Sequence, residues 1–258
     1  MLSARQLRDR MEQGENIAAH LRQDAQSVTN TQAIIELAYD LQAGSYVAGL
    51  QDSSLRLHKE RLAEHLAGKM RNICQPASVL DAGMGEATTL SAVMARLASP
   101  QTTFFGFDIS WSRIATARAW LRSQSGADVV MCTGELQALP YADSSVDVVY
   151  TTHAIEPNRG AEEAILRELH RVARECVVLF EPDYDLASAD ARERMDRHGY
   201  CRGLRATAEK LGYEVVEHTA YADSFRRDNP SATTVIRKRG GGGGTRDSSW
   251  PARNIGPA

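Results

Sequence analysis

One stretch of the chain decides its fold: Val79-Leu80-Asp81-Ala82-Gly83-Met84-Gly85-Glu86-Ala87-Thr88-Thr89-Leu90. An apolar run ends in an acidic residue, two glycines follow, and a segment with the apolar spacing of a helix begins. This order is typical of a buried strand that turns into a helix. Glycine lets the backbone take unusual angles and lets a ligand come close. The stretch therefore predicts a ligand site at the carboxyl end of a parallel strand.

Working outward from this turn, short apolar runs alternate with amphipathic helices. The alternation predicts βαβ units and a mostly parallel sheet. Two closing strands have no long helix between them, so we expect an antiparallel pair there. The sequence thus predicts an α/β fold with a Rossmann-like, doubly wound sheet of seven strands. The predicted strands are Ser78–Leu80, Thr103–Phe107, Val129–Cys132, Val146–Tyr150, Cys176–Phe180, Glu214–Thr219 and Thr233–Arg237.

The chain divides by pattern into three parts. Residues 1–72 read as helical, with Gly44 as a break, and no strand signal appears before Ala77. Residues 73–238 carry the alternating pattern of the sheet domain. Residues 239–258 include five consecutive glycines and a polar segment that contains proline, a composition that predicts a flexible tail.

Composition excludes several classes of protein. The chain has 258 residues, 43% hydrophobic and 24% charged, as in an ordinary globular protein. The formal net charge of -3 argues against a nucleic-acid partner. The sequence has no apolar run of about 18 residues and no signal-peptide core, so we expect no membrane span and a cytoplasmic location. Four scattered cysteines suggest neither zinc nor a disulfide framework.

The opening turn favours a cationic ligand over a pyrophosphate. A dinucleotide turn reads G-x-G-x-x-G, and its third glycine is replaced here by Thr88. Asp81 stands just before the turn, where its charge would repel a pyrophosphate. A nicotinamide-dependent oxidoreductase is therefore a poor match.

Two further acidic residues suit the two ends of a nucleoside. Asp108 ends the second strand, where a carboxylate accepts hydrogen bonds from ribose hydroxyls, and Ile109 offers a purine an apolar face. The alternative is that Asp108 only caps the next helix, although Ser110 could do so instead. After the third strand, Glu135 can accept a hydrogen bond from an adenine amino group, and the amide of Leu136 can reach a ring nitrogen. A solvated loop glutamate is the alternative there.

The fourth strand ends in a polar cluster at the same edge of the sheet. Thr151 would line a ligand there. His153 and Glu156 are candidate catalytic acid/base residues that face the substrate, although each is also compatible with a structural or exposed position. An H-x-x-E spacing without a second pair of ligands predicts no metal site.

Together these four elements resemble the class I S-adenosylmethionine-dependent methyltransferases, especially the broad group of quinone-biosynthesis and small-molecule enzymes. The resemblance implies S-adenosylmethionine as cofactor and a lid formed by the N-terminal helices. The implied cofactor contacts are Tyr39, Gln42, Tyr46, Asp81, Ala82, Gly83, Gly85, Asp108, Ile109, Gly134, Glu135, Leu136 and Thr151.

The chain departs from this family pattern at three places. Ala87 stands where the family often has a glycine, and Glu135 stands where it commonly has an aspartate. Glu156-Pro157 takes the place of a pair of histidines in the region that faces the substrate. We expect O-, N- or C-methylation of a small molecule, with His153 and Glu156 assisting. The alternative is a non-catalytic subunit that binds a cofactor or a partner on the same fold. The sequence leaves a homodimer open.

Overall fold

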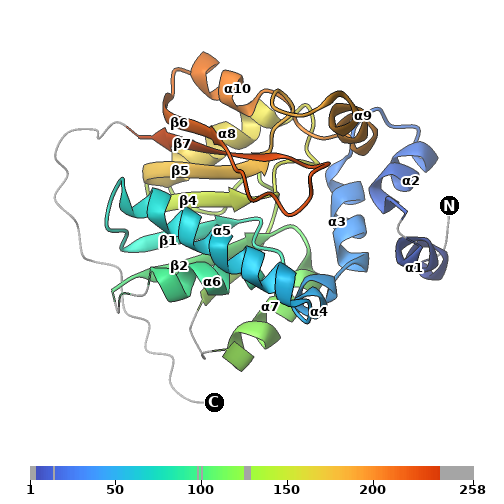
Figure 1. Ribbon diagram of the computed structural model, residues 1–258, viewed down its shortest axis with the longest axis horizontal. Helices are drawn as coiled ribbons and strands as arrows, with labels where there is room; N and C mark the ends of the chain where they lie inside the picture. Colours follow the sequence, from blue (N-terminus) through green and yellow to red (C-terminus); the bar gives the residue numbers. More distant parts are fainter. Residues whose placement is uncertain (1–3, 14, 98, 100, 125–128, 239–258) are drawn as a thin grey trace.

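A seven-stranded sheet lies between two layers of helices in the computed structural model (Figure 1). The structure describes residues 4–13, 15–97, 99, 101–124 and 129–238, so the predicted tail over 239–258 lies outside the described residues. The strand order is β3-β2-β1-β4-β5-β7-β6. β7 runs antiparallel to both β5 and β6, and the other pairs are parallel. The predicted fold class and the antiparallel closing pair are confirmed.

Each predicted strand is present, and most extend by a few residues. β5 extends most, because it pairs with β4 on one side and with β7 on the other. The strands are β1 (Ser78–Ala82), β2 (Thr103–Asp108), β3 (Val129–Thr133), β4 (Val146–Thr152), β5 (Ala173–Pro182), β6 (Glu214–Ala220) and β7 (Ser231–Arg237).

Helices cover both faces of the sheet, and each face has its own apolar core. One core joins the sheet to α5, α6 and α7, and the other joins it to α8 and α10. The helices are α1 (Ala4–Glu12), α2 (Ile17–Asp24), α3 (Gln32–Leu41), α4 (Ser45–Gly49), α5 (Ser53–Arg71), α6 (Thr88–Arg96), α7 (Trp111–Gln124), α8 (Glu162–Val172), α9 (Ala189–His198) and α10 (Leu204–Lys210).

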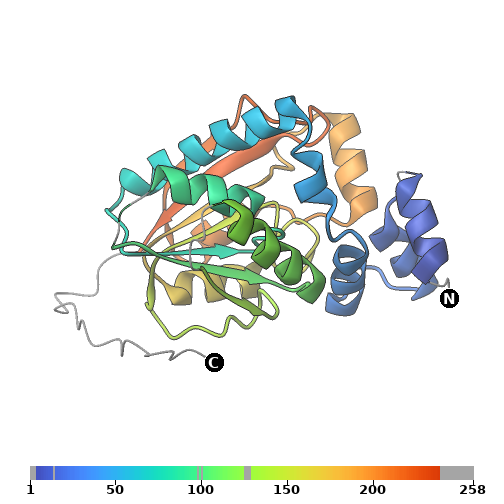
Figure 2. The same ribbon diagram turned by 90° about the horizontal axis from the view of Figure 1, so that it is seen from below.

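The strand order reverses between β1 and β4, and this reversal places the site. Parallel sheets bind ligands at the carboxyl ends of the strands beside such a switch point. Figures 1 and 2 show α1, α2, α3 and α9 gathered beyond one end of the sheet. Arg22 of α2 joins two of these helices, since its guanidinium donates to the main-chain oxygens of Arg197 and His198 at the end of α9.

No helix among the described residues is both long enough and apolar enough to cross a membrane.

Candidate functional site

The glycine turn is held in a shape that side chains would block. Gly83 has a φ of +94°, and a Cβ there would lie 2.2 Å from the Cβ of Ala154. Gly85 has a φ of +56°, also in the left-handed region that favours glycine. The main-chain N–H groups of Gly83 and Met84 both donate to the carbonyl of Phe107, at 2.7 and 2.9 Å. These bonds fix the turn after β1 against the end of β2.

Asp108 organises the turn from the neighbouring strand. Its carboxylate accepts from the main-chain N–H of Gly85 at 2.8 Å and from that of Ser110 at 2.9 Å. Ser110, as expected, caps α7, because its hydroxyl accepts from the N–H of Arg113. A carboxylate has about four lone-pair sites, so Asp108 keeps capacity for two hydroxyl donors. Burial raises the pKa of Asp108, and the charge of Arg113 opposes that rise.

Asp81 lies fully buried just before the turn. Its Oδ2 accepts from the hydroxyl of Tyr150 on β4 at 2.7 Å, while its Oδ1 has no hydrogen-bond donor. Burial raises the pKa of Asp81 to about 7, against the opposing effects of Tyr150 and of the nearby Lys59 charge. A cationic group near Oδ1 would favour the ionised carboxylate and satisfy the free oxygen.

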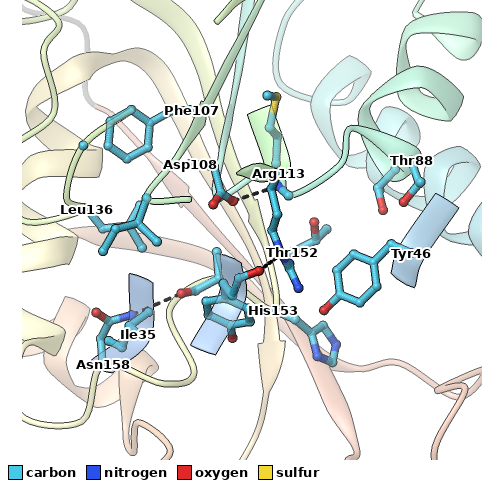
Figure 3. Close-up of a pocket in the computed structure, with 18 of the residues that line it drawn as sticks. Ile35, Tyr46, Thr88, Phe107, Asp108, Arg113, Leu136, Thr152, His153 and Asn158 are labelled. Atoms are coloured by element: carbon cyan, nitrogen blue, oxygen red, sulfur yellow. Dashed lines mark hydrogen bonds between the residues drawn. The ribbon is translucent and has the colours of Figure 1, made fainter. Parts of the chain in front are cut away.

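A cavity runs along the carboxyl edge of the sheet (Figure 3). We call it the cofactor cavity. Figure 3 shows Asp108 and Leu136 at one side of it and Thr88 and Tyr46 at the other. Its free space is about 70 Å³. A ligand of nucleoside size therefore enters only if side chains that narrow the cavity, such as Arg113, move aside.

Arg113 links the N-terminal helices to the sheet domain. Its guanidinium lies 4.4 Å from the ring centres of both Tyr39 and Tyr46, a distance at which cation–π attraction operates. It also donates to the carbonyl of Tyr39 and to the side chain of Gln42. Asp40 adds a further link by accepting from the hydroxyl of Ser110 at 2.5 Å. The C-terminal end of α3 is therefore fastened to the residues that follow Asp108.

Glu86 fastens the same segment to the glycine turn. Its side chain is fully buried, and its two oxygens accept from the main-chain N–H groups of Gly44 and Val47, each at 2.8 Å. Gly44 has a φ of +97° and begins the short α4, in agreement with the predicted helix break. The carboxylate therefore caps α4 from a loop about forty residues away. A negative charge at a helix N-terminus is stabilising.

His153 and Glu156 form a pair after β4. His153 Nδ1 lies 3.1 Å from a carboxylate oxygen of Glu156, and its Nε2 lies 3.0 Å from the hydroxyl of Ser231. Burial alone would lower the pKa of His153, but the hydrogen bond and charge of Glu156, with Glu181, raise it overall. His153 also has a φ of +54°. A left-handed conformation at a non-glycine residue is frequent at functional sites.

Glu181 supports the loop that carries this pair. Its buried carboxylate accepts from the main-chain N–H groups of Ala154, Ile155 and Glu156, at 3.0 to 3.3 Å. Burial raises its pKa to about 7, and the neighbouring His153 works against that rise. The loop after β4 therefore takes its shape from the end of β5.

A second cavity of about 260 Å³ adjoins the first. We call it the acceptor cavity. The two share Tyr46, Lys59, Thr152 and His153. The lining of the acceptor cavity is partly apolar and partly polar. The apolar residues are Leu55, Leu62, Phe180 and Phe225, and the polar ones include Glu156, Ser224, Arg226, Asn229 and Ser231.

The structure brings most of the predicted site residues to one place. Nine of them line the cofactor cavity: Tyr39, Tyr46, Gly83, Gly85, Asp108, Ile109, Gly134, Leu136 and His153. Glu156 lines the acceptor cavity. Ala82, Asp81 and Thr151 are buried beside the turn and strands, and the Thr151 hydroxyl has no hydrogen-bond partner. Gln42 contacts Arg113, and Glu135 is exposed.

No group of three or more His, Cys, Asp or Glu side chains within the described part of the chain could hold a metal ion.

Comparison with known proteins agrees with this geometry. Residues 79–175 match the family model of a methyltransferase domain. Over these residues the chain is similar to the methyltransferase domain family. The matched residues run from β1 into β5 and so include the glycine turn, Asp108 and the loop after β4.

Solved methyltransferase structures share the fold at low sequence identity. Magnesium protoporphyrin IX methyltransferase from Synechocystis PCC 6803, with bound SAH, is 13% identical with a TM-score of 0.59, covering 81% of this chain and 100% of that one. A putative methyltransferase in complex with the Haloferax volcanii Trm112 methyltransferase activator is 18% identical with a TM-score of 0.59. The match covers 77% of this chain and 96% of that one. A putative sarcosine dimethylglycine methyltransferase from Galdieria sulphuraria is 13% identical with a TM-score of 0.55. The match covers 69% of this chain and 85% of that one. At these identities the likeness shows a shared fold alone.

Three contributors to this candidate site were missed from the sequence. Glu86 stands inside the quoted turn, but its partners are main-chain groups of a distant segment. Arg113 is a charged residue among the apolar positions of α7, and that placement was the available signal. Glu181 directly follows the predicted fifth strand, Cys176–Phe180, whereas in the structure it lies inside β5 and its carboxylate accepts from the loop after β4.

Proposed function

We propose that this chain binds S-adenosylmethionine and methylates a small-molecule acceptor. The observation that carries the proposal is the pair of adjoining cavities. One lies over the glycine turn and Asp108, the other holds the His153–Glu156 pair, and they share four lining residues. Such a junction suits the meeting of a group donor with an acceptor.

The residues around the cofactor cavity suit the parts of this cofactor. Asp108 has spare acceptor capacity for ribose hydroxyls, and Ile109 and Leu136 offer apolar surface to an adenine. At the other end, the free oxygen of buried Asp81 calls for a cationic donor. Glu135, which is exposed, stays a prediction as a partner of the adenine amino group. When bound, S-adenosylmethionine supplies a methyl group on a positively charged sulfur, open to displacement by a nucleophile.

The acceptor cavity suits a small amphipathic molecule. Its volume of about 260 Å³ is near the lower end of the range for small-molecule sites. The apolar lining residues of α5, with Phe180 and Phe225, would hold a ring or short chain, while Asn229 and Ser231 offer hydrogen bonds. A folded macromolecule could present only a narrow projecting group to such a space.

The His153–Glu156 pair points to an acceptor that must lose a proton. A hydroxyl is a weak nucleophile until a base takes its proton. His153 in its neutral form can be that base, and Glu156 stabilises the imidazolium that results. The Ser231 hydroxyl contacts Nε2, so the proton of the acceptor reaches this nitrogen either through the Ser231 hydroxyl or after that hydroxyl moves aside. We therefore favour O-methylation over N- or C-methylation.

Two measurements in sequence test this proposal. Calorimetric titration with S-adenosylhomocysteine should show one site, and radiolabelled methyl transfer should then appear with hydroxylated small molecules in a mixed panel. Failure to bind S-adenosylhomocysteine would overturn the proposal. Binding without transfer across hydroxyl, amine and carbon acceptors would instead favour a non-catalytic subunit on this fold. The cytoplasmic location and the division at residues 72 and 238 remain predictions.

Glu86→Ala is expected to loosen the N-terminal segment. The change leaves the N–H groups of Gly44 and Val47 without hydrogen-bond partners. Each of these groups that stays buried lowers the free energy of unfolding by about 1–3 kcal/mol. A loss of about 2 kcal/mol should lower the melting temperature by about 4–8 °C. Differential scanning calorimetry measures it, with Glu60→Ala, which removes an exposed glutamate, as control. Equal melting temperatures for the two variants would contradict the role of Glu86.

A further inference from the structure

Ser231, His153 and Glu156 form a line of polar groups in the acceptor cavity. The Ser231 hydroxyl lies 3.0 Å from Nε2 of His153, and Nδ1 of the same ring lies 3.1 Å from a carboxylate oxygen of Glu156. All three residues line the acceptor cavity. In such a line the imidazole can take the proton of the hydroxyl, and the carboxylate stabilises the imidazolium that forms. The Ser231 hydroxyl is therefore joined to the base of the proposed reaction.

Glu156 decides which nitrogen of a neutral His153 carries the proton. An ionised carboxylate can only accept a hydrogen bond, so the nitrogen that faces it keeps its N–H. This leaves the lone pair on Nε2, and the Ser231 hydroxyl is then the donor to Nε2. The amide of Asn229 lies 3.5 Å from Nδ1, a longer contact than that of the carboxylate.

The main chain holds Ser231 against the histidine. Ser231 is the first residue of β7, pairs with Pro182 of β5, and has 3% of its surface exposed. Its N–H donates to the hydroxyl of Ser224 at 3.1 Å, and its carbonyl accepts from the N–H of Tyr221 at 2.8 Å. The main chain at Ser231 therefore cannot move away from Nε2 unless these bonds break.

The Ser231 hydroxyl has the capacity to serve two partners at once. A serine hydroxyl has one donor and two acceptor lone pairs. It can therefore donate to Nε2 and accept from the hydroxyl of a bound acceptor. The carbonyl oxygen of Asn229 is a second possible acceptor for its proton, but at 3.4 Å it is more distant than Nε2.

We propose that Ser231 is a catalytic residue that relays the proton of the acceptor hydroxyl to His153. The inference rests on the proposed function and deepens it. The acceptor proton passes to Oγ of Ser231 while the Ser231 proton passes to Nε2, so serine is regenerated and His153 becomes an imidazolium beside Glu156. The bond from the acceptor oxygen to the methyl carbon forms as the bond from that carbon to sulfur breaks, and the electron pair of the broken bond stays on sulfur.

The first measurement needs no acceptor. Long-range ¹H–¹⁵N NMR of the histidine-labelled protein, with the His153 signals assigned from the His153→Asn variant, identifies which ring nitrogen is protonated. We expect neutral His153 to carry its proton on Nδ1. A proton on Nε2 would overturn the relay, because the Ser231 hydroxyl could not then donate to that nitrogen.

The second measurement removes the hydroxyl. Ser231→Ala should lower kcat for a hydroxyl acceptor about tenfold or more, less than loss of the base itself, because a water molecule can enter the vacated space. Calorimetry should show the affinity for S-adenosylhomocysteine unchanged within about twofold, or about 0.4 kcal/mol. Single-turnover methyl transfer by the wild-type chain in mixtures of H₂O and D₂O should depend on the deuterium fraction along a curve, since two protons move in one step.

A second hydroxyl–histidine–carboxylate line on the same strand provides the matched control. The hydroxyl of Thr234 lies 2.9 Å from Nδ1 of His218, and Nε2 of that ring lies 3.2 Å from a carboxylate oxygen of Asp183. None of these three residues lines the cofactor or the acceptor cavity. Thr234→Val removes this hydroxyl with little change of shape and should leave kcat unchanged.

The other outcomes are distinct. An unchanged or raised kcat in Ser231→Ala would overturn the relay, because the acceptor would then reach Nε2 directly. A lower kcat together with a lower melting temperature and weaker binding of S-adenosylhomocysteine would also overturn it and give Ser231 a structural role. A straight-line dependence on the deuterium fraction would mean that at most one proton moves, again contrary to the relay. A wild-type chain that transfers no methyl group would instead refute the proposed function, and the NMR measurement would still decide the donor at Nε2.

Discussion

Asp108→Asn is expected to weaken binding of S-adenosylhomocysteine at least 100-fold, or about 2.8 kcal/mol. The carboxylate uses both oxygens on main-chain N–H groups, those of Gly85 and Ser110. An asparagine side chain offers one oxygen and would turn an NH₂ group toward one of these donors. The substitution therefore removes one of the two oxygens that could accept from the ribose hydroxyls and disturbs the glycine turn at the same time.

Asp147→Asn is the matched control for this substitution. Asp147 is also a buried aspartate whose carboxylate accepts from two main-chain N–H groups, those of Ala77 and Ser78, but it lies at the amino end of β4. Calorimetry below both melting temperatures should show near-normal affinity for Asp147→Asn and none measurable for Asp108→Asn. Comparable affinities in the two variants would mean that Asp108 does not contact the cofactor.

The fold was predictable because local pattern and topology agree. β1, β2 and β4 are short, mostly apolar runs, and the crossovers from β1 to β2 and from β2 to β3 carry α6 and α7, whose buried residues lie at helical spacing. The antiparallel pairing of β6 and β7 was predictable because no long helix separates these two strands in the sequence. The extra length of β5 could not be predicted, because it depends on pairing with β7, which lies about fifty residues further along the chain.

The site was only partly predictable, because its polar residues act across long separations. Strand ends carry Asp108 and His153, so the sequence alone placed them at one edge. Glu86 and Lys59 depend on how the helices before β1 pack onto the glycine turn, and residue spacing contains no signal for that packing. Asn229, in the β6–β7 connection, and Ser231, the first residue of β7, reach His153 across the sheet edge, and no sequence pattern links them to it.

His153→Asn is expected to lower kcat at least 100-fold with a hydroxyl acceptor, while the affinity for S-adenosylhomocysteine stays within twofold. Removal of a general base typically lowers a rate by about 10²–10⁴-fold. The base must be neutral, so kcat/KM should fall as the pH drops through the raised pKa of His153. Because Glu156 raises that pKa, Glu156→Gln should shift the acid limb of the profile to lower pH, and it should reduce kcat less than His153→Asn.

A second histidine–glutamate pair provides the control for the catalytic pair. His20 Nε2 lies 2.5 Å from a carboxylate oxygen of Glu15 within the N-terminal helices, and neither residue lines the two cavities. His20→Asn should leave both kcat and the pH profile unchanged. If Glu156→Gln lowered kcat without moving the acid limb, the carboxylate would be positioning the loop after β4 rather than tuning His153. If His153→Asn kept full activity, the base would have to be a different residue, and the case for O-methylation would lose its main support.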